Sequence, residues 1–119
     1  MHEVSIMAEA VRMAVASAQA AGARRITGLR LRIGTLSGVV PEALRFAWDV
    51  ARRDTIAGDA WLEIEPVPAA GWCGRCAAEF ACGDFLNECP RCHEPSGELR
   101  RGRELEIASV EIVPGERAR

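Results

Sequence analysis

The chain has 119 residues, of which 49% are hydrophobic and 27% charged, and its formal net charge is −2. These values are typical of a globular protein with one modest core, and they leave room for only a small second unit. The lack of a long apolar stretch excludes a membrane-spanning helix, and the acidic balance argues against a nucleic-acid-binding protein, whose affinity would come from excess positive charge.

The first predicted element is an amphipathic helix over residues 4–21. Small and apolar side chains recur there at the spacing of a single helical face, and Gly22 is suited to end the helix. The predicted inward face comprises Val4, Met7, Ala8, Val11, Ala14, Val15 and Ala18.

Two strands are predicted before the cysteine-rich segment. Residues 28–34 alternate between apolar side chains and arginines, which is the pattern of a half-buried strand. Residues 61–65 alternate as well, with Leu62 and Ile64 on one face. This second strand is expected to end at Pro66, because proline cannot donate to a sheet.

Between these strands a second helix is predicted from Pro41, since proline is favoured at the first helical position. Gly58 marks a break after it. The inward face is expected to carry Leu44, Ala47, Trp48 and Ala51.

A third strand is predicted over residues 104–113, and its alternation changes phase at Ala108-Ser109, as it would at a β-bulge. An isolated strand is not stable, and the preceding unit offers only two strands. The third strand is therefore expected to return to that unit and complete a three-stranded sheet covered by both helices.

The predicted fold class is α+β, with a small inserted domain. The composition changes abruptly at residues 66–71, a stiff and then flexible connection, and a cysteine-rich segment follows. We expect residues 1–68 and 103–119 to form an α/β domain, and residues 69–102 to form a zinc-ribbon-like domain inserted into it.

Four of the five cysteines form two C-x2-C pairs, Cys73/Cys76 and Cys89/Cys92, with twelve residues between the pairs. Each pair can wrap one edge of a tetrahedral metal. The N-terminus lacks the basic region and apolar block of a secretory signal, so a cytoplasmic location is predicted and metal is favoured over disulfides. A rubredoxin-type iron site is the alternative to zinc. Four thiolates leave no open position, which indicates a structural site.

Two residues close to the pairs have separate interpretations. Cys82 lies between the pairs and is interpreted as a small half-buried hydrophobe, with a spare ligand or redox-labile thiol as the alternative. His93 directly follows the second pair and is interpreted as an exposed polar residue. Its alternative role is to replace a thiolate that acid has protonated.

The N-terminus offers a second kind of metal chemistry. The α-amino group of Met1, the amide nitrogen of His2 and the His2 imidazole can close adjacent chelate rings on one ion. The amide or carboxylate of Glu3 can complete a fourth position. Such nitrogen-rich planar sites favour Ni(II) or Cu(II). Judged from residue type alone, a histidine next to the N-terminus is more often an ordinary terminal side chain than a metal ligand.

Several motifs together resemble the HypA/HybF family of hydrogenase nickel-incorporation proteins. They are Met1-His2-Glu3 before a helix, the segment 34–46 (GTLSGVVPEALRF), the two cysteine pairs and the segment 102–107 (GRELEI). The resemblance covers nearly the whole chain. It implies a nickel metallochaperone in which His2 is the principal side-chain ligand of Ni(II), Glu3 assists and the Met1 amine takes part.

The resemblance also implies structural Zn(II) on the four paired cysteines. The implied partners are a [NiFe]-hydrogenase large-subunit precursor, a nickel-binding maturation GTPase of the HypB type and, in some bacteria, urease maturation proteins. Some relatives carry a histidine after each cysteine pair, whereas here Ala77 follows the first pair. Strong acid sensing is therefore not carried over to this chain.

The runner-up interpretation is a zinc-ribbon module that binds protein or nucleic acid. A nucleic-acid module would need a basic face, but residues 69–103 carry five Arg against five acidic residues. An enzyme is not predicted, because the sequence has no paired acid and base, nucleophile elbow or phosphate loop.

Overall fold

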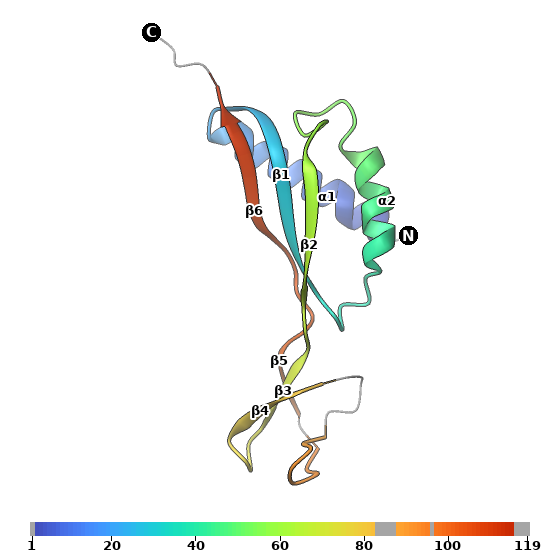
Figure 1. Cartoon of the computed structure of the whole chain (residues 1–119), viewed down its shortest axis with the longest axis vertical. Helices are drawn as coiled ribbons and strands as arrows, with labels where there is room; N and C mark the ends of the chain where they lie inside the picture. Colours follow the sequence, from blue (N-terminus) through green and yellow to red (C-terminus); the bar gives the residue numbers. More distant parts are fainter. Residues whose placement is uncertain (1, 83–87, 96, 116–119) are drawn as a thin grey trace. The chain divides into compact units, whose positions relative to one another are not determined.

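The computed structural model describes residues 2–82, 88–95 and 97–115 (Figure 1). Its elements confirm the predicted α+β class. No helix among these residues is both long and apolar enough to cross a membrane. In chain order the elements are α1 (His2–Ala20), β1 (Ala23–Gly34), α2 (Pro41–Ala51), β2 (Trp61–Val67), β3 (Ala70–Cys73), β4 (Ala78–Ala81), β5 (Glu98–Arg101) and β6 (Leu105–Pro114).

The chain divides into two compact units. The first, called here the helical unit, takes in the chain up to Leu31, Val39–Glu65 and the residues from Glu106 onward. The second, called the cysteine unit, takes in Arg32–Gly38 and Pro66–Leu105.

The helical unit contains a sheet with the strand order β2-β1-β6. The third predicted strand does return, and it lies beside β1 as expected. Figure 1 shows α1 crossing behind this sheet, and α2 packs against α1. The three-stranded sheet with two helices was therefore predicted correctly, and the largest fully buried side chains of the unit are Met7, Ile26, Leu29 and Leu44.

Helix α1 buries a narrower face than predicted. Val4 and Ala8, which were expected to face inward, are exposed. Ala8 lies about 100° round the helix from the fully buried Met7, and Val4 lies in the first turn. Gly22 adopts a φ of +76°, which fits its predicted role as the residue that ends the helix. The buried residues are Met7, Ala10, Val11, Ala14 and Ala18.

Helix α2 begins at Pro41, as predicted, and ends at Ala51. It buries Leu44, Ala47 and Trp48, whereas Ala51, also expected inside, is only half-buried. Turns occupy the residues between the helix end and Gly58.

Strand β2 continues through Pro66 to Val67, so the predicted end at Pro66 was wrong. The strand lies at the edge of the sheet, where a residue without an N–H group costs no hydrogen bond to a neighbouring strand. In β6, Ser109 and Val110 are half-buried in succession, so the burial pattern changes phase close to the predicted point. The β-bulge itself stays a prediction.

The cysteine unit contains a second sheet with the order β4-β3-β5, in which β3 pairs antiparallel with both neighbours. No strands are predicted from the sequence in this unit. Residues 66–71 were expected to form a connection, but β2 runs to Val67 and β3 begins at Ala70. Short strands with little apolar alternation are weak sequence signals, since their stability depends on their neighbours.

The turn after β1 holds the two chain segments that lead into and out of the cysteine unit. Thr35 donates its N–H to the carbonyl of Val67 (3.0 Å), and its hydroxyl accepts from the N–H of Ala69 (3.1 Å). On the other side, Leu36 donates to the carbonyl of Gly102 (2.7 Å). A Cβ atom on Gly34 would lie 2.1 Å from the carbonyl carbon of Gly102, so only glycine fits there.

We therefore expect Gly34→Ala to lower the free energy of unfolding by about 2–3 kcal/mol, because backbone must move to admit the methyl group. Denaturant titration followed by circular dichroism measures this. Gly97→Ala is the control, since the space around Gly97 is open to 4 Å. Equal stabilities of the two variants would contradict the close approach at Gly34.

Candidate metal centre

The four paired cysteines come together at one point in the cysteine unit. Cys73 ends β3, Cys76 lies in the turn that leads to β4, and Cys89 and Cys92 lie in a second turn before β5. Their four Sγ atoms lie within 4.8 Å of one another. Among the described residues, this is the cluster of His, Cys, Asp or Glu with ligand atoms close enough to share a metal ion.

The sulfur–sulfur distances suit a tetrahedral metal. Cys73 Sγ lies 3.5 Å from Cys92 Sγ, and Cys89 Sγ lies 3.9 Å from Cys76 Sγ. Zinc–sulfur distances of about 2.3 Å give a regular tetrahedron with sulfur–sulfur edges of about 3.8 Å. A disulfide would need about 2.0 Å, and all of these cysteines are free. The four-sulfur donor set therefore fits Zn(II), and it leaves no ligand position for water or substrate.

The two turns that carry the pairs have similar backbones. In the first, Cys76 donates its N–H to Cys73 Sγ at 3.3 Å. The residue after each pair has a positive φ, +51° at Ala77 and +62° at His93. A left-handed residue at this point reverses the chain so that both sulfurs of a pair face the same centre. This backbone geometry could not be predicted at Ala77, because alanine rarely adopts the left-handed region, and at His93 the residue type gives only a weak signal for it.

The electrostatics of the cluster favour a cation between the sulfurs. Hydrogen bonds from the backbone N–H groups of Cys92 and Arg91 lower the pKa of Cys89 to about 6. The pKa of Cys76 is raised to about 12, first by its hydrogen bond with Cys92 and then by burial. One thiolate thus forms readily. Repulsion between negative charges on such closely spaced sulfurs opposes ionisation of the other thiols. A divalent cation removes this opposition and allows the remaining thiols to ionise.

Cys82 and His93 lie outside this cluster. Cys82 is 8% exposed and donates its N–H to the carbonyl of Ala69, so it is a small hydrophobe as predicted, but it is buried where half-burial was expected. The His93 side chain is 73% exposed, and its Nδ1 lies 2.9 Å from a carboxylate oxygen of Glu88. His93 is therefore an exposed polar residue here, and its partner Glu88 was missed by the sequence analysis.

The predicted nickel ligands lie at the start of α1. His2 is the exposed first residue of the helix, while Met1 lies outside the described residues. The Glu3 carboxylate accepts a hydrogen bond of 3.1 Å from the N–H of Val40, and this bond lowers the pKa of Glu3. The sequence predicted a helix start at Pro41 but not that Glu3 would lie against it.

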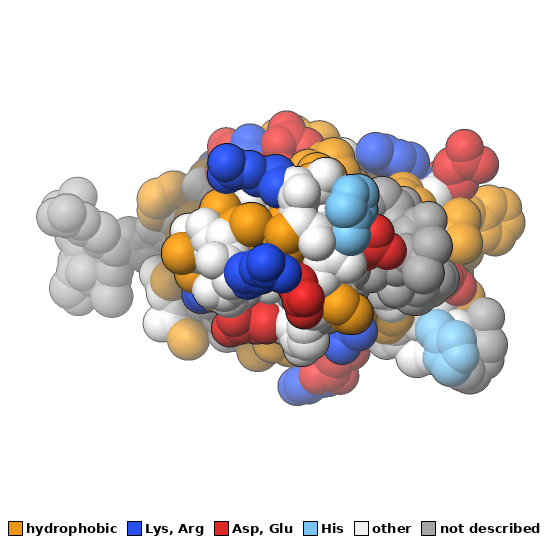
Figure 2. Space-filling view, turned by 90° about the horizontal axis from the view of Figure 1, so that it is seen from below, with side chains coloured by type: hydrophobic (Ala, Val, Ile, Leu, Met, Phe, Trp, Pro, Cys, Tyr) orange, Lys and Arg blue, Asp and Glu red, His pale blue; other side chains and the backbone are white. Residues whose placement is uncertain are grey.

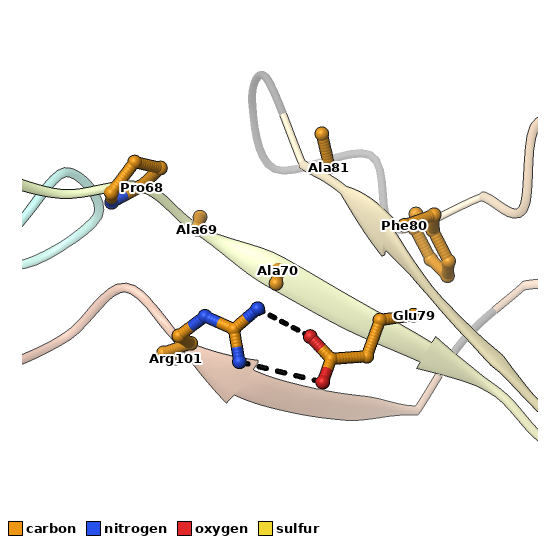
Figure 3. Close-up of a pocket in the computed structure, with 7 residues that line it drawn as sticks. All are labelled: Pro68, Ala69, Ala70, Glu79, Phe80, Ala81 and Arg101. Carbon is orange, nitrogen blue, oxygen red and sulfur yellow. Dashed lines mark hydrogen bonds and ion pairs between the residues drawn. The ribbon is translucent and has the colours of Figure 1, made fainter.

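A pocket of about 300 Å³ lies elsewhere in the cysteine unit (Figure 3). Glu79 and Arg101 form an ion pair across it, and the other lining residues are apolar. Since its two charged groups neutralise each other, this pocket offers no free acid–base pair for catalysis. The apolar lining residues are Pro68, Ala69, Ala70, Phe80 and Ala81.

Comparison with known proteins supports a metal-related role. Residues 1–112 match the family described as "Hydrogenase/urease nickel incorporation, metallochaperone, hypA". A hydrogenase maturation factor HypA from Picosynechococcus sp. is 44% identical over 113 residues, which is 95% of this chain and 100% of the relative. One from Chloroflexus aurantiacus is 44% identical over 112 residues, or 93% and 98% of the two chains.

Two solved structures share the fold. The solution structure of the Ni metallochaperone HypA from Helicobacter pylori has a TM-score of 0.69 at 21% identity and covers 94% of this chain and 97% of its own. A second solution structure of a HypA protein has a TM-score of 0.71 at 23% identity, with coverages of 95% and 97%.

The cluster leads to a prediction for the paired cysteines. We expect Cys73→Ser or Cys92→Ser to abolish tight metal binding, because a hydroxyl does not replace a thiolate on a soft site. The loss of metal should make residues 70–103 sensitive to protease, since this segment has few apolar contacts of its own. Metal analysis and limited proteolysis measure the two effects.

Cys82→Ser is the matched control, because Cys82 lies outside the cluster. It should keep the metal content of the unsubstituted protein. Retained protease resistance in the metal-free Cys73 or Cys92 variants would show that the sulfur cluster does not hold this unit together.

Proposed function

Since the chain belongs to the HypA family of hydrogenase and urease nickel-incorporation metallochaperones, we propose that it binds Ni(II) at its N-terminus and delivers the ion to a [NiFe]-hydrogenase precursor. The observation that best supports the N-terminal site is the position of His2, which is exposed and begins α1. The first N–H groups of a helix have no acceptor within it. Nickel can therefore take the amide nitrogen of His2 without breaking a helical hydrogen bond.

The proposed ligands are the Met1 amine, the amide and imidazole nitrogens of His2, and a fourth donor from Glu3, for which its amide nitrogen and its carboxylate are the two candidates. An exposed site at a helix terminus suits a carrier, because the acceptor can reach the ion and the terminal turn opens at little cost. Ligation requires a deprotonated amine and a neutral imidazole, so affinity should fall below neutral pH.

In this proposal the cysteine cluster holds a different ion. Zn(II) on Cys73, Cys76, Cys89 and Cys92 fills every ligand position and stabilises the inserted segment, which we assign as a zinc domain over residues 69–102. The nickel-binding domain is then formed by residues 1–68 and 103–119. The two sites have different roles in this proposal. The closed cysteine site retains Zn(II), and the open N-terminal site exchanges Ni(II).

The proposed partners are the hydrogenase large-subunit precursor and a HypB-type GTPase, with urease maturation proteins as further clients, and the proposed location is the cytoplasm. No catalytic residue is assigned. On the face shown in Figure 2, arginines are interspersed with acidic side chains, so the visible described residues form no continuous basic field. This distribution counts against the nucleic-acid-binding alternative.

The central test is nickel binding by His2→Ala. We expect calorimetry on untagged protein to show nickel affinity reduced at least about 100-fold, because the variant loses one donor and its chelate ring. Circular dichroism and zinc content should be unchanged. His93→Ala is the control, since this histidine lies beside the zinc cluster and should leave nickel affinity unaltered.

A chain with a blocked or extended N-terminus should bind nickel as poorly as His2→Ala, because the amine is lost as a ligand. X-ray absorption of the nickel-loaded protein should show only nitrogen and oxygen neighbours. Sulfur neighbours would instead place nickel at the cysteines, and undiminished binding by the blocked chain would refute the N-terminal site.

A further inference from the structure

The start of α2 lacks a cap of its own. Val40 stands at the N-cap position with extended backbone angles (φ −93°, ψ 114°), and within the described chain no side-chain hydrogen bond of its own caps the helix. A capping box would place Glu or Gln three residues later, to accept a hydrogen bond from the N-cap N–H. That position is occupied by Ala43, which has no acceptor.

Glu3 supplies the missing acceptor from another helix. Its carboxylate accepts the Val40 N–H at 3.1 Å, across 37 positions of sequence. A carboxylate is also favoured near a helix N-terminus by the helix dipole, and Glu3 lies at two such termini, in the first turn of α1 and beside the start of α2. One side chain thus joins the N-terminal turn to a second helix within the helical unit.

We propose that the Glu3 carboxylate is a positioning group, which anchors the first turn of α1 to the Val40 N–H and holds the chelating nitrogens of His2 ready for nickel without being a nickel ligand itself. This inference rests on the proposed function. An unanchored first turn frays, and only the ordered fraction of chains presents the chelate, so apparent affinity falls in proportion to that fraction.

The donor can be removed without touching the N-terminus. Val40→Pro eliminates the N–H group, and the backbone of Val40 is already extended (ψ 114°), so that proline needs only a change of φ from −93° toward its preferred value of about −65°. We expect Val40→Pro and Glu3→Ala each to weaken nickel binding roughly 5- to 10-fold. The double variant should bind nickel no more weakly than Glu3→Ala alone, because Val40→Pro removes a hydrogen bond that Glu3→Ala has already lost.

Two conservative variants serve as controls. Glu3→Gln keeps an oxygen acceptor, and Val40→Ala keeps the donor while removing an exposed side chain. Both should stay within about twofold of the unsubstituted protein. Melting temperatures should differ little across the series, so that loss of affinity is not loss of fold. Hydrogen exchange at the Val40 amide should be slow in the unsubstituted protein and in Glu3→Gln, and fast in Glu3→Ala.

A nickel-ligand role for the carboxylate predicts the opposite pattern. Glu3→Gln would then weaken binding and Val40→Pro would not, and that result overturns this inference while leaving the N-terminal site intact. Fast exchange at the Val40 amide in the unsubstituted protein would overturn it as well. Failure of the unsubstituted chain to bind nickel would refute the proposed function and this inference together.

Discussion

The close approach of four cysteine sulfurs is the constraint on which the cysteine unit depends. Its strands β3, β4 and β5 have four residues each, too few to bury much apolar surface. Thiols within 4.8 Å of one another cannot all ionise unless a cation lies between them. A four-coordinate metal of the kind that suits this geometry would balance the thiolate charge and add to the stability of the unit, and four thiolates would leave it no open ligand position.

The N-terminal turn has requirements opposite to those of the closed cysteine cluster. It begins with the exposed His2, its first N–H groups lack helical acceptors, and a hydrogen bond from the Val40 N–H to the Glu3 carboxylate links it to the start of α2. A carrier must order its ligands well enough to bind and hold them weakly enough to release. In the proposed role as a nickel carrier, a solvent-exposed hydrogen bond of this kind suits both requirements, because it can order the turn and still open.

Much of the helical unit could be predicted because its signals are local. Alternation in β1, the stripe of α1 and the proline at the start of α2 each reflect the period or φ preference of a single segment. The return of β6 to the first sheet followed from a general argument, that an unpaired strand is unstable. The predicted element bounds were wrong where they depend on neighbouring strands. Strand β2 continues through Pro66, for example, because it lies at the edge of the sheet, where a proline costs no hydrogen bond.

The sequence by itself determined the α+β class, the order of the main elements and the two C-x2-C pairs. Hydrophobic periodicity and the spacing of metal ligands are local properties, which can be read from short segments of the chain. Only the tertiary structure decided that four sulfurs from two separate turns share one centre, that Cys82 and His93 stand apart from it, and that Glu3 lies on the amide of Val40. These are contacts between residues distant in sequence, and no local preference of either partner specifies them.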